Sequence, residues 1–375
     1  MKSLYTLIFS LCVFTLRAQF AVGHVSESFT DPSRADRAIA CEIYYPSNTG
    51  GDNVSVADGQ FPFVVFGHGF VMDYAAYGNI TEALVSEGFV MIYVETEGGF
   101  APVHNDFGLD LAFMADHFYD EIANAASPFY GRLEDRCAIM GHSMGGGATW
   151  LAATTSASVD CIAGLAPAET NPSAIAAASS VNVPALVFSG SSDAVTAPAT
   201  NHVPIFEGTA SACKYFVNII EGSHCGYADS GSLCDFGEFG FNGLSREEQQ
   251  EITHDLLLAY FDYYLRDIAS GLGVIQNYDS PQSNTETQIE CLSSVANTEV
   301  QGMLVFPNPC TESLFLEGDA NGSMNYCVMD LTGREVVSGV LMFSGGRAEV
   351  STVQLPAGVY TMRVDDGSGV WFVKR

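Results

Sequence analysis

The stretch GHSMG, residues 141–145, decides how this chain folds. It follows a short apolar run, residues 136–140, and begins a segment of helical composition, residues 145–155. A Gly-x-Ser-x-Gly sequence between a buried strand and a helix predicts a sharp turn that projects the serine hydroxyl above a sheet. The two glycines let neighbouring backbone pass closely. We interpret Ser143 as a nucleophile; the alternative is a tight turn needed only for packing.

Strand-like and helix-like segments alternate on both sides of this turn. Short apolar runs are typical of buried parallel strands, and longer segments have helical periodicity. We expect strands at 23–29, 38–45, 61–66, 89–94, 136–140, 160–165, 183–189 and 213–220, and helices at 77–87, 106–125, 145–155, 199–207 and 245–267. This alternation predicts an α/β fold, with a mostly parallel sheet and helices on both faces. Sites in such sheets form beyond the carboxyl ends of the strands.

A serine nucleophile needs a base, and the base needs an acid to orient it. After a turn of this kind the acid and the base follow in the order Ser, Asp or Glu, His. Asp193 comes just after the expected strand 183–189, and His224 just after 213–220. We therefore predict Ser143, Asp193 and His224 as the catalytic set. The alternatives are a turn or capping aspartate and a surface-loop histidine. The other histidines precede the serine, lie too near Asp193 or fall within a helix.

Two backbone N–H groups are expected to bind the oxyanion of the reaction. One belongs to the residue after the serine, Met144, at the positive end of the following helix. The other comes from the loop after an earlier strand, where residues 67–70 read GHGF, so we predict the N–H of Phe70. The alternative is that these glycines merely form a turn. This chemistry requires no metal and no cofactor, and no His or Cys set has metal-ligand spacing.

The charge balance excludes whole classes of partner. The chain has 14 Lys+Arg against 44 Asp+Glu, a formal net charge of -30. Nucleic acid is excluded as a partner because phosphate binding needs a basic patch, and anionic lipid surfaces are disfavoured for the same reason. Most of the acidic residues lie in residues 19–297. A negative field disfavours anionic substrates, which points to neutral esters; solubility is the alternative explanation.

Composition divides the chain into four parts. Residues 1–18 combine a basic start with the apolar run LYTLIFSLCVFTL and are read as a signal peptide, cleaved after Ala18, too short to span a membrane. Residues 19–267 form the expected catalytic domain, and residues 268–297 lack periodicity and are expected to be a linker. Residues 298–375 carry short strand-like runs separated by Gly, Asn and Asp, which predicts a small β-sandwich. We see no transmembrane segment.

Export to an oxidising compartment makes disulfides plausible. Removal of the signal peptide would take away Cys12 and leave nine cysteines, so at least one has no intramolecular partner. The sequence does not fix the connectivity. Three pairings serve as hypotheses: Cys137 with Cys161, Cys225 with Cys234, and Cys310 with Cys327.

The segment from about Gly23 to Asp267 resembles a known family. The matching segments are residues 43–46 (IYYP), 67–70 (GHGF), 141–146 (GHSMGG), 190–193 (GSSD) and 222–225 (GSHC). They look like the secreted α/β-hydrolase esterases of the cutinase and polyester (PET) hydrolase type, with chlorophyllase-like and dienelactone-hydrolase-like enzymes as neighbours. The resemblance implies an α/β-hydrolase fold and ester hydrolysis. One departure is Ala168-Glu169, where an aromatic residue often follows Ala-Pro; its absence would weaken stacking on an aromatic polymer.

The C-terminal module resembles the type IX secretion sorting domain of Bacteroidetes. The matching segments are residues 305–309 (VFPNP), 329–334 (MDLTGR), 355–360 (LPAGVY) and the basic end 374–375. The resemblance implies export across the outer membrane by the type IX machinery, and so an extracellular or cell-surface protein. The alternative is an ordinary substrate-binding β-sandwich.

We therefore expect a secreted, monomeric serine esterase that acts on a neutral small-molecule or polymeric ester. The alternatives are a lipase, carbohydrate esterase or peptidase on the same triad, or a non-catalytic binding protein on a hydrolase scaffold. The long loop 226–243 borders the site and either restrains His224 or gates access; a solvated connection is the alternative. No sizeable insertion follows the serine turn, so we expect no large lid.

Overall fold

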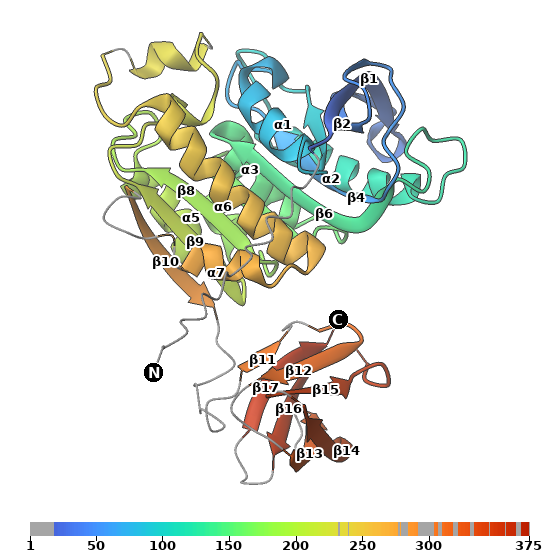
Figure 1. Ribbon diagram of the computed structural model, residues 1–375. Coiled ribbons are helices and arrows are strands. Elements are labelled where there is room, and N and C mark those ends of the chain that lie inside the picture. Colours follow the sequence, from blue (N-terminus) through green and yellow to red (C-terminus); the bar gives the residue numbers. More distant parts are fainter. Residues whose placement is uncertain are drawn as a thin grey trace, which may run out of the picture.

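The computed structural model describes most of the chain beyond the expected signal peptide, residues 1–18, which lie outside the described residues. Described are residues 19–231, 233–238, 240–276, 278, 284–291, 304–306, 310–317, 322–330, 334–344, 346–356, 358–364 and 369–374. A ten-stranded sheet with helices forms the larger part, and two smaller sheets form the C-terminal part (Figure 1). No helix among the described residues is long and apolar enough to cross a membrane.

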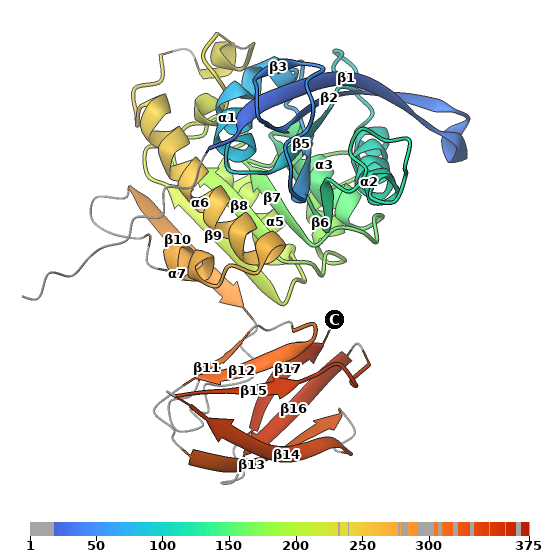
Figure 2. The same cartoon turned by 45° about the vertical axis from the view of Figure 1, so that its right-hand side comes forward.

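The central sheet has the strand order β10-β9-β8-β7-β6-β4-β5-β2-β1-β3. Neighbours from β9 to β5 pair in parallel, while β2, β1 and β10 pair antiparallel at the two edges, β1 and β2 as a long ribbon (Figure 2). The strands are β1 (Ala21–Asp31), β2 (Arg37–Ser47), β3 (Gly51–Asp52), β4 (Phe61–Gly67), β5 (Val90–Val94), β6 (Leu133–His142), β7 (Cys161–Leu165), β8 (Ala185–Gly190), β9 (Cys213–Ile219) and β10 (Thr285–Cys291). The predicted α/β fold with a mostly parallel sheet is confirmed.

Helices cover both faces of this sheet, which is why its inner strands are apolar on both sides. Along β4, Phe63 and Val65 belong to one core cluster, and Val64 and Phe66 to the other. The first cluster is closed by α2 (His104–Glu121), α3 (Met144–Ala153), α4 (Ala174–Ala178) and α5 (His202–Gly208). The second is closed by α1 (Gly78–Val85), α6 (Arg246–Arg266) and α7 (Ser270–Gln276), with α6 in front of the sheet in Figure 1.

The C-terminal part is a small β-sandwich, as predicted. One sheet has the order β11-β12-β15 and the other β14-β13-β16-β17, and every pair is antiparallel. Leu314 and Leu316 of the first sheet share one core cluster with Val328 and Phe372 of the second. The strands are β11 (Leu304–Phe306), β12 (Ser313–Glu317), β13 (Gly322–Asp330), β14 (Glu335–Phe343), β15 (Arg347–Ser351), β16 (Gly358–Val364) and β17 (Gly369–Lys374).

The expected linker, residues 268–297, contains regular structure, so that prediction is wrong for α7 and β10. Strand β10 joins the central sheet, with Thr285 opposite Ile219 and Cys291 opposite Cys213 of β9. Ile289 and Cys291 are the apolar residues of this strand, and both are only partly buried against the core. An edge strand needs little apolar sequence, and this one therefore lacks the pattern of a buried strand. The part of the chain that builds the sheet reaches Cys291.

The structure contains two disulfides among its described residues. The predicted bond between Cys225 and Cys234 is confirmed, and a second, unpredicted one joins Cys213 to Cys291. The pairing of Cys137 with Cys161 is wrong: Cys161 lies opposite Ala138, so the two thiols point to opposite faces of the sheet.

The pairing of Cys310 with Cys327 is also wrong. Both thiols are free; Cys310 is in the sandwich core, whereas Cys327 precedes the core residue Val328 and points to the other face of β13.

Candidate active site

Ser143 occupies the turn between β6 and α3 in a strained conformation. Its φ is 54° and its ψ is -116°, a region that non-glycine residues rarely adopt. The flanking glycines are sterically required. A Cβ on Gly145 would lie 2.0 Å from the carbonyl oxygen of Gly67, and one on Gly141 would lie 2.4 Å from the backbone of Gly145. The Ser143 N–H donates to the carbonyl of Leu165 at 2.9 Å, which holds the turn over β7.

The loop after β4 lies against this turn. The N–H of Gly145 donates to the carbonyl of His68 at 3.0 Å, which brings the Phe70 loop beside the start of α3. No acceptor among the described residues takes the N–H of Phe70 or of Met144. Two free amides next to a serine at a helix N-terminus are suited to bind a negatively charged oxygen.

Asp193 and His224 are in direct contact. Asp193 follows β8, His224 follows β9, and Nδ1 of His224 lies 2.8 Å from Oδ2 of Asp193. Both side chains are almost completely buried. Burial would raise the pKa of Asp193, but the hydrogen bond and charge interaction with His224 outweigh it and lower that pKa to about 2. The carboxylate is therefore ionised and can orient a histidine and stabilise its protonated form.

The two loops that carry this pair approach very closely. A Cβ on Gly190, at the end of β8, would lie 2.6 Å from the carbonyl oxygen of Gly222. The N–H of Ser192 donates to that same carbonyl at 2.9 Å. This backbone contact fixes the separation of the two loops and therefore the distance between Asp193 and His224.

Thr196 and His202 belong to this site and were not predicted as part of it. The Thr196 hydroxyl lies 2.9 Å from Oδ2 of Asp193, 2.9 Å from Nδ1 of His224 and 3.0 Å from Nε2 of His202. Nε2 of His202 is 3.6 Å from Asp193, and its Nδ1 lies 2.9 Å from the hydroxyl of Ser189. Burial lowers the pKa of His202 to about 4, so it is neutral at pH 7. It is completely buried, which suits a supporting role behind the aspartate.

His142, the residue before the serine, connects three loops. Its Nε2 donates to the carbonyl oxygen of His224 at 3.0 Å, and its Nδ1 lies 3.0 Å from the hydroxyl of Tyr77. That hydroxyl accepts the N–H of Gly69 at 2.8 Å. Burial, and then the neighbouring His224, lower the pKa of His142 well below its usual value, so the ring is neutral. The sequence showed that this residue adjoins the turn but not that it bridges to His224.

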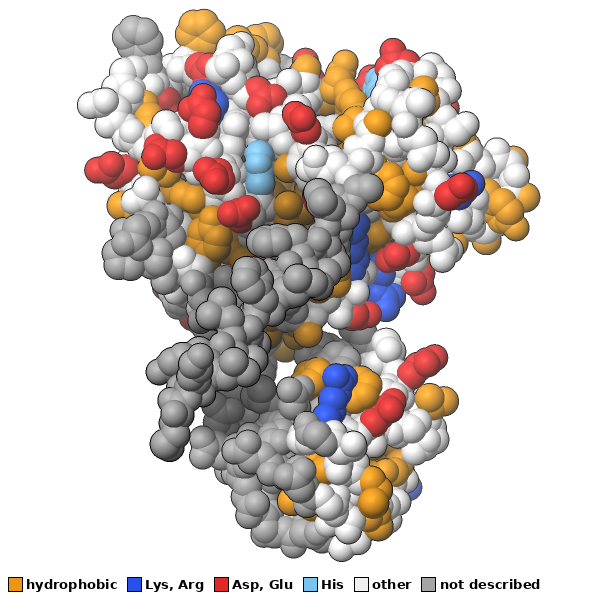
Figure 3. All heavy atoms as spheres, viewed as in Figure 1, with side chains coloured by type: hydrophobic (Ala, Val, Ile, Leu, Met, Phe, Trp, Pro, Cys, Tyr) orange, Lys and Arg blue, Asp and Glu red, His pale blue; other side chains and the backbone are white. Residues whose placement is uncertain are grey.

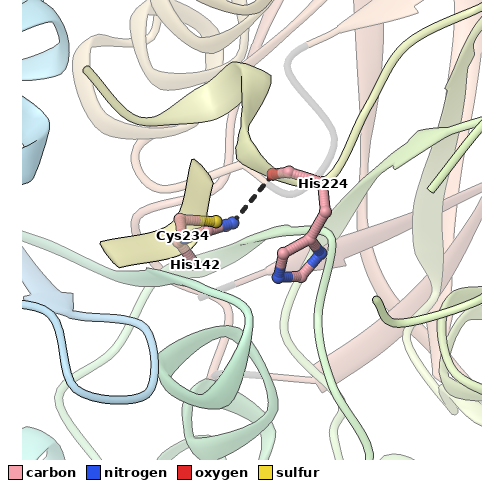
Figure 4. Close-up of side chains that lie close together, drawn as sticks. All are labelled: His142, His224 and Cys234. Carbon is pink, nitrogen blue, oxygen red and sulfur yellow. Dashed lines mark hydrogen bonds between the residues drawn. The ribbon is translucent and has the colours of Figure 1, made fainter. Parts of the chain in front are cut away.

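One group of side chains has a spacing that resembles a metal site. His142, His224 and Cys234, drawn in Figure 4, lie close together, and their ligand atoms are within 4.8 Å of one another. The residues do not fit a metal ion, because the sulfur of Cys234 is bonded to Cys225 and both ring nitrogens of His142 already have partners. To bind a metal, a cysteine must be a free thiolate and a histidine must offer an available ring nitrogen.

The position where an aromatic ring was expected is used differently. The N–H of Ala168 donates to the carbonyl of Ser143 at 2.9 Å. The carboxylate of Glu169 accepts the N–H of Ile175, at 3.0 Å, near the start of α4. These residues brace the serine turn and α4, so this wall of the site has no aromatic surface from them.

Comparisons with known proteins identify the family of this chain. Residues 16–247 match the family described as PET hydrolase-like. The chain belongs to that family. A curated relative, the bis(hydroxyethyl) terephthalate hydrolase of Streptomyces coelicolor, is 29% identical over 218 residues, which are 58% of this chain and 64% of the relative. The chain therefore spans just under two thirds of that relative's length. The predicted resemblance to PET-hydrolase-type proteins is confirmed.

The C-terminal resemblance is confirmed as well. Residues 304–375 match the secretion system C-terminal sorting domain. This domain indicates export, to the cell surface or the extracellular space.

Proposed function

We propose that this member of the PET hydrolase-like family is a serine hydrolase that cleaves neutral carboxylic esters through an acyl-enzyme. The observation that carries the proposal is the buried contact between Asp193 and His224, beyond the same sheet edge as the strained Ser143. The family match supports ester hydrolysis, and the name of the Streptomyces relative supports esters of aromatic acids as first substrates to test.

In the proposed mechanism Ser143 Oγ attacks the ester carbonyl while Nε2 of His224 takes its proton. The N–H groups of Phe70 and Met144 stabilise the oxyanion. Asp193 holds Nδ1 and stabilises the imidazolium, which then gives the proton to the leaving alcohol. Water, deprotonated by His224, attacks the acyl-enzyme and releases the carboxylic acid and free Ser143. The chain's own residues supply every proton transfer.

Apolar side chains around the site favour an apolar substrate. Among the described residues between 19 and 291, most of the exposed large apolar side chains lie on loops after β4, β5, β8 and β9, namely Phe70, Phe100, Val103, Val195, Leu233, Phe236 and Phe241. The rings of Phe70 and Phe100 meet edge to face, with centroids 6.4 Å apart. Acidic side chains dominate the charge on the face that carries α6 (Figure 3). Both features favour neutral, apolar esters over anionic ones.

A hollow beside the site could hold one half of such an ester. It has a volume of about 290 Å³ and lies between the residues after Phe70 and those after His224. Its walls include Val71, Met72, Asp73, Ala75, Asp229 and Leu233.

We propose that the protein acts as a monomer after the type IX machinery has exported it.

Labelling with a fluorophosphonate tests the proposed nucleophile. Wild type is expected to be labelled and to hydrolyse p-nitrophenyl esters, and Ser143→Ala is expected to lose both. Equal labelling of the variant would show that Ser143 is not the nucleophile. A panel of aromatic and aliphatic esters of rising chain length, acetylated sugars, peptides and a polyester film then separates an esterase from a lipase, carbohydrate esterase or peptidase.

A further inference from the structure

The carboxylate of Glu238 binds the backbone of the proposed catalytic histidine. Its Oε1 accepts the N–H of His224 at 2.5 Å, and its Oε2 accepts the N–H of Cys225 at 2.9 Å. Glu238 ends the short 3-10 helix η5 (Leu233–Glu238), within the long loop after β9. One carboxylate thus binds two successive amides, and hydrogen bonds to charged acceptors are about twice as strong as neutral ones.

Two contacts fasten η5 just before Glu238, at Cys234 and at Asp235. The disulfide between Cys225 and Cys234 ties η5 directly to the residue after His224. Arg246, at the start of α6, binds Asp235 of η5 at 2.6 Å and the carbonyl of Cys225 at 2.7 Å. The same arginine therefore holds η5 and the histidine loop together, and Glu238 has little freedom to leave the two amides.

The remaining backbone groups of the histidine loop are held by other elements. Gln249 of α6 accepts the Ser223 N–H at 2.8 Å and donates to the Ser223 carbonyl at 2.9 Å. His142 donates to the carbonyl of His224. Among the described residues, Glu238 is the acceptor for the His224 amide itself. The backbone that aims the imidazole at Asp193 therefore depends on this carboxylate.

We propose that Glu238 is a positioning residue, which fixes the backbone of His224 so that its ring serves Ser143 and the leaving group with the correct geometry. Two contacts position the Glu238 carboxylate: the disulfide between Cys225 and Cys234, and the ion pair of Arg246 with Asp235. The proposal rests on the proposed function, because it assigns Glu238 a role through His224. It also gives the loop 226–243 a restraining role rather than that of a solvated connection.

This role predicts a particular kinetic signature. His224 takes a proton from Ser143 in every acylation, but its return of that proton matters most when the leaving group is a poor one. An alkoxide must be protonated as it leaves, whereas p-nitrophenolate leaves without a proton. A displaced His224 therefore slows alkyl esters more than p-nitrophenyl esters, whereas partial unfolding slows both equally.

The test compares an ethyl and a p-nitrophenyl ester of the same acid in wild type, Glu238→Gln and Glu238→Asp. Gln keeps the size of the side chain but places an N–H₂ group against one of the two amides. We expect its kcat to fall on the order of 10- to 100-fold more on the ethyl ester than on the p-nitrophenyl ester, with KM within about twofold. Asp keeps the charge and should recover part of the loss. Glu221→Gln, at an exposed site in the same loop, is the control and should leave the ratio unchanged.

The outcomes separate this proposal from the proposed function. If wild type hydrolyses both esters through Ser143 and Glu238→Gln lowers both rates equally, or lowers only the Tm, Glu238 is a structural residue and the positioning role is wrong. If wild type shows no turnover that depends on Ser143, the proposed function fails, and the role of Glu238 with it.

Discussion

The two ends of strand β9 each carry a disulfide, and the two bonds have different consequences. Cys213 opens the strand and joins Cys291 of β10, across 78 residues of chain. Cys225 lies beyond the other end and joins Cys234, across only nine. Loop-closure entropy gives about 4.5 kcal/mol for the first and about 2.6 kcal/mol for the second. The bond at the amino end closes the edge of the fold, whereas the bond at the carboxyl end fixes the loop that carries His224.

The largest expected loss of activity comes from replacing His224, beyond the carboxyl end of β9. His224→Ala should lower kcat on a p-nitrophenyl ester by at least about 10⁴-fold, because the proposed base is lost while the scaffold remains. His202→Ala, which removes a buried ring behind Asp193, should instead lower the Tm and cost far less activity. Kinetics and thermal melts of both variants decide between the two histidines. The reverse pattern would make His202 the base and refute the role of His224.

The second prediction dissociates the two disulfides. Cys213→Ser with Cys291→Ser should lower the free energy of unfolding by about 4 kcal/mol and leave kcat/KM unchanged at temperatures where the protein stays folded. Cys225→Ser with Cys234→Ser should cost less stability but lower kcat on an ethyl ester by about tenfold, because η5 and Glu238 are released. Urea unfolding and steady-state kinetics measure the two effects.

If the two double cysteine variants behave alike, the two disulfides do not have different roles. If both double variants lose stability alone, the bond between Cys225 and Cys234 does not act through His224. If both lose activity alone, the edge of the sheet is coupled to the site, and the separation of the two ends of β9 is wrong.

The two disulfides also show what the sequence could reveal. Cys225 and Cys234 lie on one short loop, so their pairing follows from local spacing. Cys213 and Cys291 meet only because β10 pairs with β9, and β10 has too few apolar residues to be recognised as a strand. The failed pairing of Cys137 has a related cause: a shift of one residue between parallel strands reverses the face, and the sequence does not contain the register.

The site divides in the same way. Ser143, Asp193 and His224 were predictable as candidates because each follows a recognisable strand, and the glycine pattern marks the turn. Thr196 had a local signal, since the Asp193 carboxylate accepts the N–H of Val195 and of Thr196 in a turn typical of an Asp-x-x-Thr sequence. Glu238 and Tyr77 had none, because their contacts arise from tertiary packing of loops far apart in the chain.

The third prediction concerns how the contact between Asp193 and His224 stabilises the folded protein at low pH. The pKa of Asp193 is about 2 in the folded protein and 3.8 without the fold, so its stabilisation is complete above about pH 4 and is lost as the pH falls towards 2. The difference corresponds to about 2 kcal/mol. Asp193→Asn lacks this titration. The gap in unfolding free energy between wild type and Asp193→Asn should therefore close by about 2 kcal/mol from pH 5 to pH 2. A constant gap would mean that the buried contact with His224 does not stabilise the ionised form.

The smallest effect comes from Glu95, which also lies at the carboxyl edge of the sheet, just after β5. Burial raises its pKa to about 8, and its carboxyl oxygen accepts the N–H of Tyr74 at 3.0 Å. A carboxyl whose pKa is raised by folding stabilises the protein at low pH, and that stability is lost as the pH rises to the folded pKa.

Between pH 7 and pH 9 the wild type should therefore lose about 1 kcal/mol that Glu95→Gln keeps, since the amide oxygen can still accept the Tyr74 N–H. Urea unfolding of both proteins at the two pH values measures this difference. Glu221→Gln, at an exposed glutamate beyond β9, should run parallel to wild type. If Glu95→Gln also runs parallel to wild type, Glu95 is ionised already at pH 7. In that case burial of Glu95 does not destabilise the protein at neutral pH. The two ends of the strands then differ only in the loop that carries His224.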